Sequence, residues 1–268
     1  MKELLSIREF SKFSGIESST LRYWDEIGLF SPAERGSDND YRYYSPEQVT
    51  AVNFVKIFSN LNVPLKIISE IGEDRTPDST AQLIEQQERF LNMEMRRLGE
   101  CHSIIHTRRE LISRGDSVKD VSYIGVEHLE EMHFIAGPRN DFQDGEGFYK
   151  PFMEYCKQAQ ESRVNLGFPI AAMHDDWSSF VKAPGSPDFF MSMDPTGNQK
   201  SAAGDYVVGY VRGYYGQFGD LPERMVNYIK EHSLTPSGPT FSLYLHDETC
   251  ISDPSQYLAQ VYVAISSR

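Results

Sequence analysis

The sequence predicts an α+β protein of several domains: a small helical N-terminal domain, one long helix, and a larger mixed domain built on a sheet. Three observations support this. Helix-start signals crowd residues 1–75, an apolar residue returns at every seventh position over 84–112, and beyond Gly115 the apolar period changes to two. We place the domains at residues 1–75, 76–116 and 117–268. With 268 residues, 40% of them apolar, the chain can bury a core and is not of a disordered type.

Two short helices are predicted at the N-terminus, joined by a glycine-containing turn. Ser6 and Glu9 have the capping-box spacing that starts a helix, and Gly15 ends it. A second helix follows over about residues 18–26 and ends before Gly28. This pattern is typical of a helix-turn-helix, in which the second helix enters the DNA groove.

A β-ribbon and two further helices complete the predicted N-terminal domain. The run Tyr41-Arg42-Tyr43-Tyr44 is strand-prone and would form a wing beside the helices. Ser45 followed by Pro46 predicts a third helix to about Asn60, and Pro64 starts a fourth to about Ile71. Together these elements predict a winged helix-turn-helix domain.

A long helix is predicted from Thr76-Pro77 to about Ser113, roughly 50 Å at 1.5 Å per residue. Its apolar seam repeats every seven residues, at Ile84, Leu91, Leu98, Ile105 and Ile112. The companion positions are mixed, so the seam is not that of a strong parallel zipper. A helix this long needs a partner, and a symmetric homodimer is the commonest solution. The alternative is a partner helix elsewhere in the same chain.

Strands and helices alternate in the C-terminal region. The predicted strands are 121–129, 132–137, 168–174, 188–194, 206–212, 240–246 and 260–265, and the predicted helices are about 148–164 and 221–232. The order is that of a strand-helix-strand-strand unit found twice, in 121–194 and in 205–266. Such a duplicated sheet leaves a cleft where its halves meet.

Charge is distributed unevenly along the chain. The formal net charge of -13 disfavours nucleic-acid binding as a whole-chain average. However, residues 1–75 carry 9 Lys and Arg against 12 Asp and Glu, whereas residues 117–268 carry 11 against 20. The sequence contains neither a long apolar span nor a signal-peptide pattern, so we expect a cytoplasmic protein with no membrane partner. Three distant cysteines predict reduced thiols.

A family resemblance rests on residues at fixed spacing. Thr20-Leu21-Arg22-Tyr23-Trp24-Asp25-Glu26, then Gly28-Leu29, Pro32 and Tyr41-Arg42-Tyr43-Tyr44, resemble the N-terminal signature of the MerR family of transcription regulators. The order of the C-terminal elements resembles the gyrase-inhibitor-like (GyrI-like) effector-binding domain of its multidrug-sensing branch. The resemblance implies an activator that binds promoter DNA as a homodimer. On binding effector, it would distort an overlong promoter spacer so that RNA polymerase engages both promoter elements.

The predicted DNA contacts lie on the second helix, the wing and the fourth helix. Arginine can bind phosphate or guanine, and a tyrosine hydroxyl can bind phosphate. The candidates are Thr20, Arg22, Tyr23, Arg42, Tyr43 and Lys66, while Trp24 and Tyr44 are expected to pack the small core. A few cations on one face predict an affinity that falls steeply with salt.

The predicted effectors are lipophilic, cationic small molecules, because aromatic faces attract cations and the C-terminal region is acidic. The candidate ligand-binding residues are Tyr149, Trp177, Tyr206, Tyr210, Ser242 and Tyr244. The multidrug branch commonly has a buried Glu where this chain has Ser242, so the sequence departs from that pattern. Asp175, Asp176 or Glu127 could supply the carboxylate instead.

Three other functions were weighed from the sequence. Metal sensing by Cys101, His102 and His106 is disfavoured, because no second cysteine completes a thiolate site; we expect no metal or cofactor. A GyrI-like small-molecule hydrolase lacks a recognisable catalytic motif, although His174-Asp175-Asp176 forms a polar cluster. A constitutive architectural DNA-binding protein would leave the aromatic C-terminal region unused.

Overall fold

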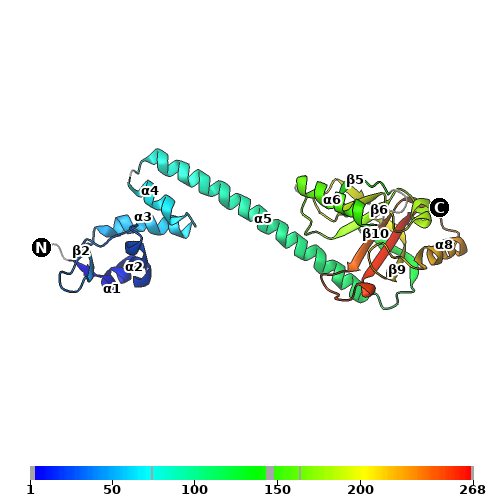
Figure 1. The fold of residues 1–268 in the computed structure, drawn as a ribbon, viewed down its shortest axis with the longest axis horizontal. Helices are drawn as coiled ribbons and strands as arrows, with labels where there is room; N and C mark the ends of the chain where they lie inside the picture. Colours follow the sequence, from blue (N-terminus) through cyan, green and yellow to red (C-terminus); the bar gives the residue numbers. More distant parts are fainter. Residues whose placement is uncertain (1–3, 74, 143–147, 163, 267–268) are drawn as a thin grey trace. The chain divides into compact units, whose positions relative to one another are not determined.

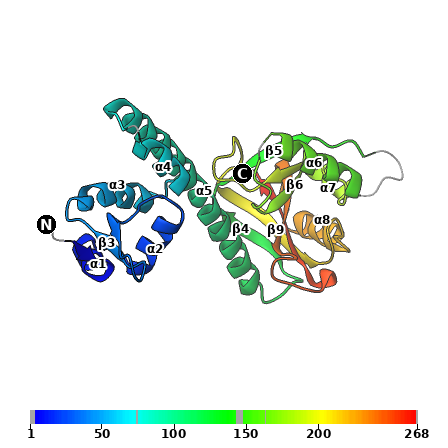
Figure 2. The ribbon, with the colours of Figure 1, turned by 60° about the vertical axis from the view of Figure 1, so that its left-hand side comes forward.

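The computed structural model describes residues 4–73, 75–142, 148–162 and 164–266 (Figures 1 and 2). It divides into two compact units, Met1–Arg97 and Leu98–Arg268. The long helix α5 (Pro77–Ser117) contributes residues to both. Among the described residues, no helix is both long enough and apolar enough to cross a membrane.

The N-terminal unit is a winged helix-turn-helix, as predicted. Its helices are α1 (Ile7–Ser14), α2 (Ser18–Glu26), α3 (Gln48–Asn60) and α4 (Leu65–Glu73). Three short antiparallel strands, β1 (Leu5–Ser6), β2 (Glu34–Arg35) and β3 (Arg42–Tyr44), form a sheet in the order β1-β3-β2.

Local hydrogen bonds explain where these helices begin and end. The Glu9 amide donates to Ser6 Oγ at 3.3 Å, and the Ser6 amide donates to the Glu9 carboxylate at 2.8 Å, which confirms the capping box. Gly15 ends α1 in the left-handed conformation that glycine adopts freely (φ 68°). Helix α3 begins at Gln48, two residues later than predicted. The Gln48 side chain accepts a 3.0 Å bond from the Ser45 amide, in a turn that precedes the helix.

Aromatic stacking organises the core of this unit. The Tyr44 ring lies 4.6 Å from that of Phe10 and 5.8 Å from that of Phe30. Near the start of α5, Leu83 is buried in the same core, and the Gln87 side chain donates to the Leu61 carbonyl. These contacts fix the first turns of α5 to the N-terminal unit.

The predicted apolar seam of α5 is largely exposed in the single chain. The side chains of its first four members are 37–67% exposed, namely Ile84, Leu91, Leu98 and Ile105. In contrast, Leu111 near the end of the helix is only 7% exposed and packs in the core of the C-terminal unit. The first four members of the seam therefore form an apolar surface that is largely open to water in the single chain, whereas Ile112 is half-buried.

In the described part of the chain, the C-terminal unit consists of an eight-stranded antiparallel sheet and three helices besides the end of α5. The strands are β4 (Ile124–Leu129), β5 (Met132–Arg139), β6 (Ile170–His174), β7 (Phe189–Ser192), β8 (Gln199–Ser201), β9 (Gly204–Arg212), β10 (Pro236–His246) and β11 (Leu258–Ile265). The helices are α6 (Tyr149–Glu161), α7 (Trp177–Lys182) and α8 (Leu221–Glu231), with a 3-10 turn at Pro254–Gln256. The sheet order is β4-β9-β11-β10-β6-β7-β5-β8.

The sheet is built from two copies of one unit, as the sequence predicted. β5-α6-β6-β7 and β9-α8-β10-β11 are related by a pseudo-twofold at the centre of the sheet, where β10 pairs with β6 and Ser242 faces Ala172. The first copy begins at β5, while β4 is an edge strand added to the second copy. Helix α7 and strand β8 were not predicted.

The two faces of the sheet have different partners. Helices α6 and α8 lie on one face, where Tyr155 of α6 packs with Phe190 and Met225 of α8 packs with Val207. The other face packs against Leu111 of α5. Side chains that point toward α6 and α8 at the centre of the sheet therefore lie between the two helices.

Candidate nucleic-acid interface and ligand cavity

Helix α2 separates buried from exposed residues. Leu21, Trp24 and Asp25 point into the core, whereas Arg22 is exposed and Tyr23 is 51% exposed. Thr20 is half-buried near the N-terminal end of the helix. This division follows the 3.6-residue period and leaves Arg22 and Tyr23 free to reach a partner.

The wing is held to α2 by a buried carboxylate. Asp25 Oδ2 accepts hydrogen bonds from Arg42 Nε and from Arg35 Nη2, each at 2.5 Å, and the Asp25 side chain is only 2% exposed. Arg35 also binds the exposed Asp40 at 3.0 Å. Arg42, a predicted DNA contact, is thus engaged within the protein, although its side chain is still 22% exposed.

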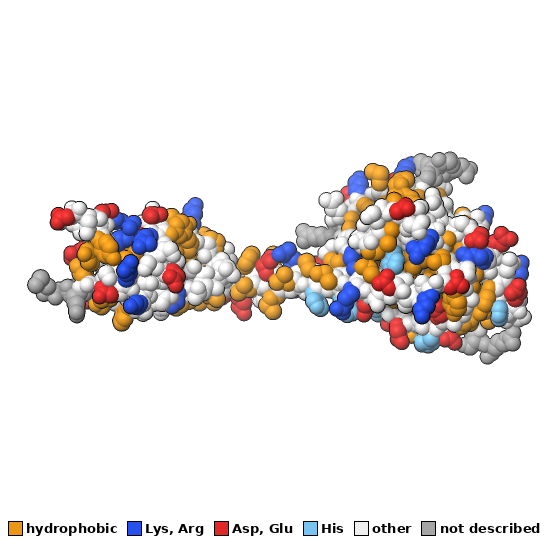
Figure 3. All heavy atoms as spheres, turned by 90° about the horizontal axis from the view of Figure 1, so that it is seen from below, with side chains coloured by type: hydrophobic (Ala, Val, Ile, Leu, Met, Phe, Trp, Pro, Cys, Tyr) orange, Lys and Arg blue, Asp and Glu red, His pale blue; other side chains and the backbone are white. Residues whose placement is uncertain are grey.

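The other predicted DNA contacts lie on the wing and α4. Tyr43 is half-buried, and its ring lies 5.4 Å from that of Tyr41. Lys66 is 86% exposed and lies 3.9 Å from Glu70. Figure 3 shows several Lys and Arg side chains gathered on one face of the N-terminal unit, with Asp and Glu among them.

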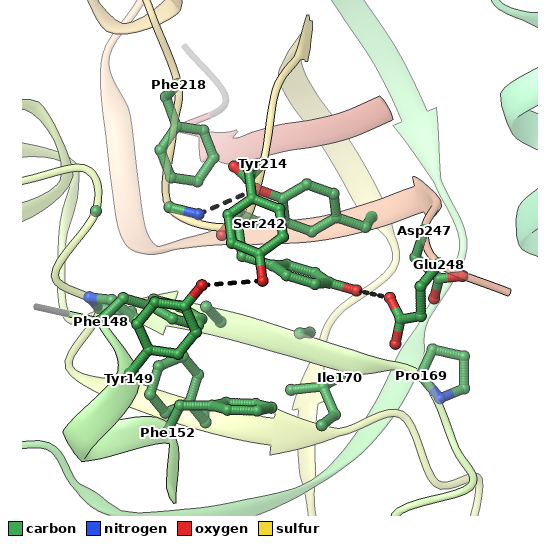
Figure 4. Close-up of a pocket in the computed structure, with 18 of the residues that line it drawn as sticks. Phe148, Tyr149, Phe152, Pro169, Ile170, Tyr214, Phe218, Ser242, Asp247 and Glu248 are labelled. Carbon is green, nitrogen blue, oxygen red and sulfur yellow. Dashed lines mark hydrogen bonds between the residues drawn. The ribbon is translucent and has the colours of Figure 1, made fainter. Parts of the chain in front are cut away.

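A cavity of about 370 Å³ lies in the C-terminal unit, between the two copies of the duplicated fold. Its walls come from α6, from the central strands β6 and β10, and from the loop that precedes α8 (Figure 4). The aromatic residues in the lining are Phe148, Tyr149, Phe152, Phe168, Phe190, Tyr214, Tyr215, Phe218 and Tyr244. Such an aromatic enclosure suits a flat or lipophilic small molecule.

Tyrosine hydroxyls tie the cavity walls together. Tyr149 donates to Tyr214 at 3.0 Å, which joins α6 to the loop before α8. The Tyr244 hydroxyl donates to the Tyr214 carbonyl at 2.9 Å and accepts from the Gly216 amide at 3.1 Å. Burial raises the pKa of Tyr244, so this hydroxyl stays protonated at neutral pH.

Two carboxylates line the cavity just beyond the end of β10. Glu248 accepts a hydrogen bond from the Tyr215 hydroxyl (Figure 4), and Asp247 lies 3.3 Å from Arg108 Nη1. Burial and the nearby Glu248 raise the pKa of Tyr215. Neither acid was predicted from the sequence. The one feature of the sequence that could have indicated them is their position directly after the strand that carries Ser242 and Tyr244.

Three of the predicted ligand-binding residues line this cavity, namely Tyr149, Ser242 and Tyr244, whereas Trp177, Tyr206 and Tyr210 do not. Tyr206 and Tyr210 lie on the opposite face of the sheet, in the core shared with α5. Trp177 begins α7 and packs 5.6 Å from Phe180. Alternation with a period of two shows which residues of one strand lie on the same face of the sheet. It does not show which residues of another strand lie on that face.

The carboxylates proposed from the sequence serve other contacts. Asp175 binds Arg139, and Asp176 caps α7 by accepting from the Ser179 amide at 2.7 Å. Glu127 accepts from the Tyr210 hydroxyl at 3.2 Å, on the face opposite the cavity. None of the three lines the cavity. In the described part of the chain, no cluster of three His, Cys, Asp or Glu residues could hold a metal ion.

His174 is a buried base on the same sheet face as the cavity. It is 1% exposed, its Nε2 lies 3.2 Å from the Ala183 carbonyl, and its Nδ1 has no hydrogen-bond partner among the described residues. Burial lowers the pKa of His174 from 6.5, and the nearby Asp188, Asp175 and Asp176 oppose this shift.

We expect this histidine to make the C-terminal unit less stable in acid. Because its pKa is lower when folded, the unfolded chain binds the proton first, and stability falls as the pH drops below about 6.5. The slope contributed is at most about 1.4 kcal/mol per pH unit. Urea unfolding across this range should show that His174→Gln reduces the acid-side slope. The same slope in both proteins would contradict the assignment.

Comparisons with known proteins agree with the arrangement of the N-terminal unit. Residues 5–74 match the model of the MerR HTH family regulatory protein. The HTH-type transcriptional regulator HmrR of Sinorhizobium medicae is 30% identical over 125 residues, which cover 45% of this chain and 84% of that protein.

Two further similarities extend over the whole chain. The multidrug-efflux transporter 2 regulator of Bacillus subtilis is 24% identical over 270 residues, 99% of this chain and 97% of that protein. The structure of EcmrR bound to DNA in an EcmrR-RPo complex has a TM-score of 0.40 and 16% identity, covering 98% of this chain and all of that one. The winged helix-turn-helix, the match over residues 5–74 and the similarity to HmrR show that this chain belongs to the MerR family of transcription regulators.

Proposed function

We propose that this protein is a homodimeric, ligand-responsive transcription activator that binds promoter DNA and distorts the promoter spacer when a lipophilic cation enters the cavity. The observation that carries the proposal is the aromatic cavity with Glu248 in its wall, in a chain that also has a winged helix-turn-helix. A relative that spans almost the entire chain has a name that describes it as a regulator of a multidrug-efflux transporter.

The ligand class follows from the chemistry of the lining. Aromatic faces attract a cation, and a carboxylate in the cavity wall offsets its charge. Glu248 takes the role predicted from the sequence for Asp175, Asp176 or Glu127. Ser242 and Ala172 are small residues at the centre of the sheet, and they leave space in the floor of the cavity.

The dimer follows from the exposed seam of α5. An apolar stripe that repeats every seven residues is stable in water when a second helix covers it. A second copy of this chain supplies the same stripe, and two DNA-binding units would then read a pseudo-palindromic site. RNA polymerase would bind at the same promoter, because the distorted spacer lets it engage both promoter elements.

A purified transcription assay tests the proposal. A promoter with an overlong spacer should give more transcript when tetraphenylphosphonium is added with this protein and RNA polymerase, and no increase without the protein. The absence of any response across several lipophilic cations would overturn the ligand-responsive function and favour a constitutive architectural DNA-binding protein. We also propose that the ligand is bound without being converted, in contrast to a hydrolase. Mass spectrometry should recover it unchanged.

Arg22 is expected to contribute directly to DNA affinity. Arg22→Ala should weaken promoter binding about tenfold or more, since an arginine contact to phosphate or a base edge contributes about 1–3 kcal/mol. It should also reduce the slope of log affinity against log salt by about one. Arg89→Ala removes an equally charged, exposed side chain from α5 and is the control. DNA affinity is measured by fluorescence anisotropy. An equal loss of affinity in the two variants would show that Arg22 does not contact the DNA.

A further inference from the structure

Three charged side chains line the cavity in the described part of the chain, and they come from two places. Asp247 and Glu248 follow β10, whereas Arg108 comes from α5. Their net formal charge is negative by one. The question is which acid would meet a cationic ligand.

Asp247 is already neutralised. Its Oδ2 lies 3.3 Å from Arg108 Nη1, and the two side chains are 15% and 25% exposed, so water screens the pair weakly. The other oxygen of Asp247 accepts from the amide of Thr249 at 2.9 Å and from its hydroxyl at 2.5 Å. Arg108 itself is fixed, because its Nε donates to the Gly167 carbonyl at 3.0 Å.

Glu248 has a different environment, because its side chain is exposed to water. The Tyr215 hydroxyl donates to it, and this hydroxyl is neutral because its pKa is raised. No Lys or Arg forms an ion pair with Glu248 among the described residues that line the cavity. A hydrogen bond from a neutral donor leaves the full negative charge of the carboxylate in place.

We infer that Arg108 determines the charge specificity of the cavity: by neutralising Asp247 it leaves one uncompensated carboxylate, Glu248, and so selects monovalent cations over dications and neutral molecules. This inference rests on the proposed function, since it assumes that the cavity binds lipophilic cations. The side chains of Arg108 and Asp247 are mostly buried, so a second positive charge on the ligand would meet the Arg108 charge with no free carboxylate to offset it. A neutral ligand would gain no charge–charge attraction to Glu248.

The test uses three probes of similar shape and different charge: phenylpyridine, its N-methyl cation, and the doubly methylated bipyridine dication. Calorimetric titration of the full-length protein at about pH 8 keeps phenylpyridine neutral. The wild type should bind the monocation about tenfold more tightly than either of the others, a difference of about 1.4 kcal/mol.

The substitutions should change this order in opposite directions. Arg108→Gln exposes a second carboxylate and should raise the affinity of the dication relative to the monocation about tenfold. Asp247→Asn leaves the Arg108 charge in place and should weaken both cations relative to phenylpyridine. The double variant, Arg108→Gln with Asp247→Asn, should restore the wild-type order. Loss of packing alone would not produce opposite shifts that cancel.

Two kinds of failure can be told apart. If the wild type binds neither cation more tightly than phenylpyridine, the proposed cation-binding function itself is wrong. The cation site stands and the role of Arg108 is overturned if the wild type prefers the monocation but two ratios stay within twofold: dication to monocation in Arg108→Gln, and monocation to phenylpyridine in Asp247→Asn. Unfolding of Arg108→Gln is checked by circular dichroism, and Asp247→Asn then decides alone.

Discussion

Ile105→Glu is expected to convert the protein to a monomer and to weaken promoter binding about 100-fold or more. Ile105 is 67% exposed in the single chain and lies in the seam with Leu91 and Leu98. In a dimer, a carboxylate at this position would be buried against the partner helix without a cation. The loss of DNA affinity follows because two linked binding units gain about 10²–10⁴ in avidity over one.

The measurement is sedimentation velocity together with promoter binding. The control is Arg96→Glu, which changes the charge more but lies on the side of α5 away from the seam. It should leave the dimer intact. A dimeric Ile105→Glu protein that binds promoter DNA normally would mean that the seam is not the dimer interface.

Asp25→Asn should destabilise the N-terminal unit by about 2–3 kcal/mol and weaken promoter binding through the wing. Asp25 is the common acceptor for Arg35 and Arg42, and its side chain is 2% exposed. Breaking a buried ion pair by removing one partner can cost about 3–5 kcal/mol, but both arginine side chains here are partly exposed, so water recovers part of the loss. The wing would lose its anchor on α2.

Asp40→Asn is a closely matched control. Asp40 binds the same Arg35 at 3.0 Å, but its side chain is 74% exposed, and asparagine tolerates its left-handed conformation (φ 51°). We expect a change below about 0.5 kcal/mol in urea unfolding of this variant. Equal destabilisation by the two substitutions would show that the burial of Asp25 does not increase its contribution to stability.

Much of the fold could be predicted because its signals are local. The capping box at Ser6 and Glu9, the glycine that ends α1 and the seven-residue repeat of α5 each depend on residues close together in sequence. The duplicated strand-helix-strand-strand order was also visible, since each element has its own apolar period. Helix α3 starts two residues later than predicted because the amides of Gln48, Val49 and Thr50 bond to carbonyls three residues earlier, which makes a turn before the helix.

The residues of the cavity could be predicted only in part. Tyr244 and Ser242 alternate with Leu243 on β10, so the sequence placed them on one face together. It could not show that Tyr210 faces the other way. That depends on the register of two further strand pairs, in which Tyr210 aligns with Gln260 and Gln260 with Leu243.

The sequence by itself determined the family, the winged helix-turn-helix, the long helix with its apolar seam and the duplicated sheet, because caps, turns and periods are properties of neighbouring residues. Only the tertiary structure decided which charges meet. Asp25 binds two arginines of the wing, and Arg108 reaches Asp247 across 139 positions of the chain. Such pairs form where the packing of separate elements brings charges together away from water, and no local pattern records which partners will meet there.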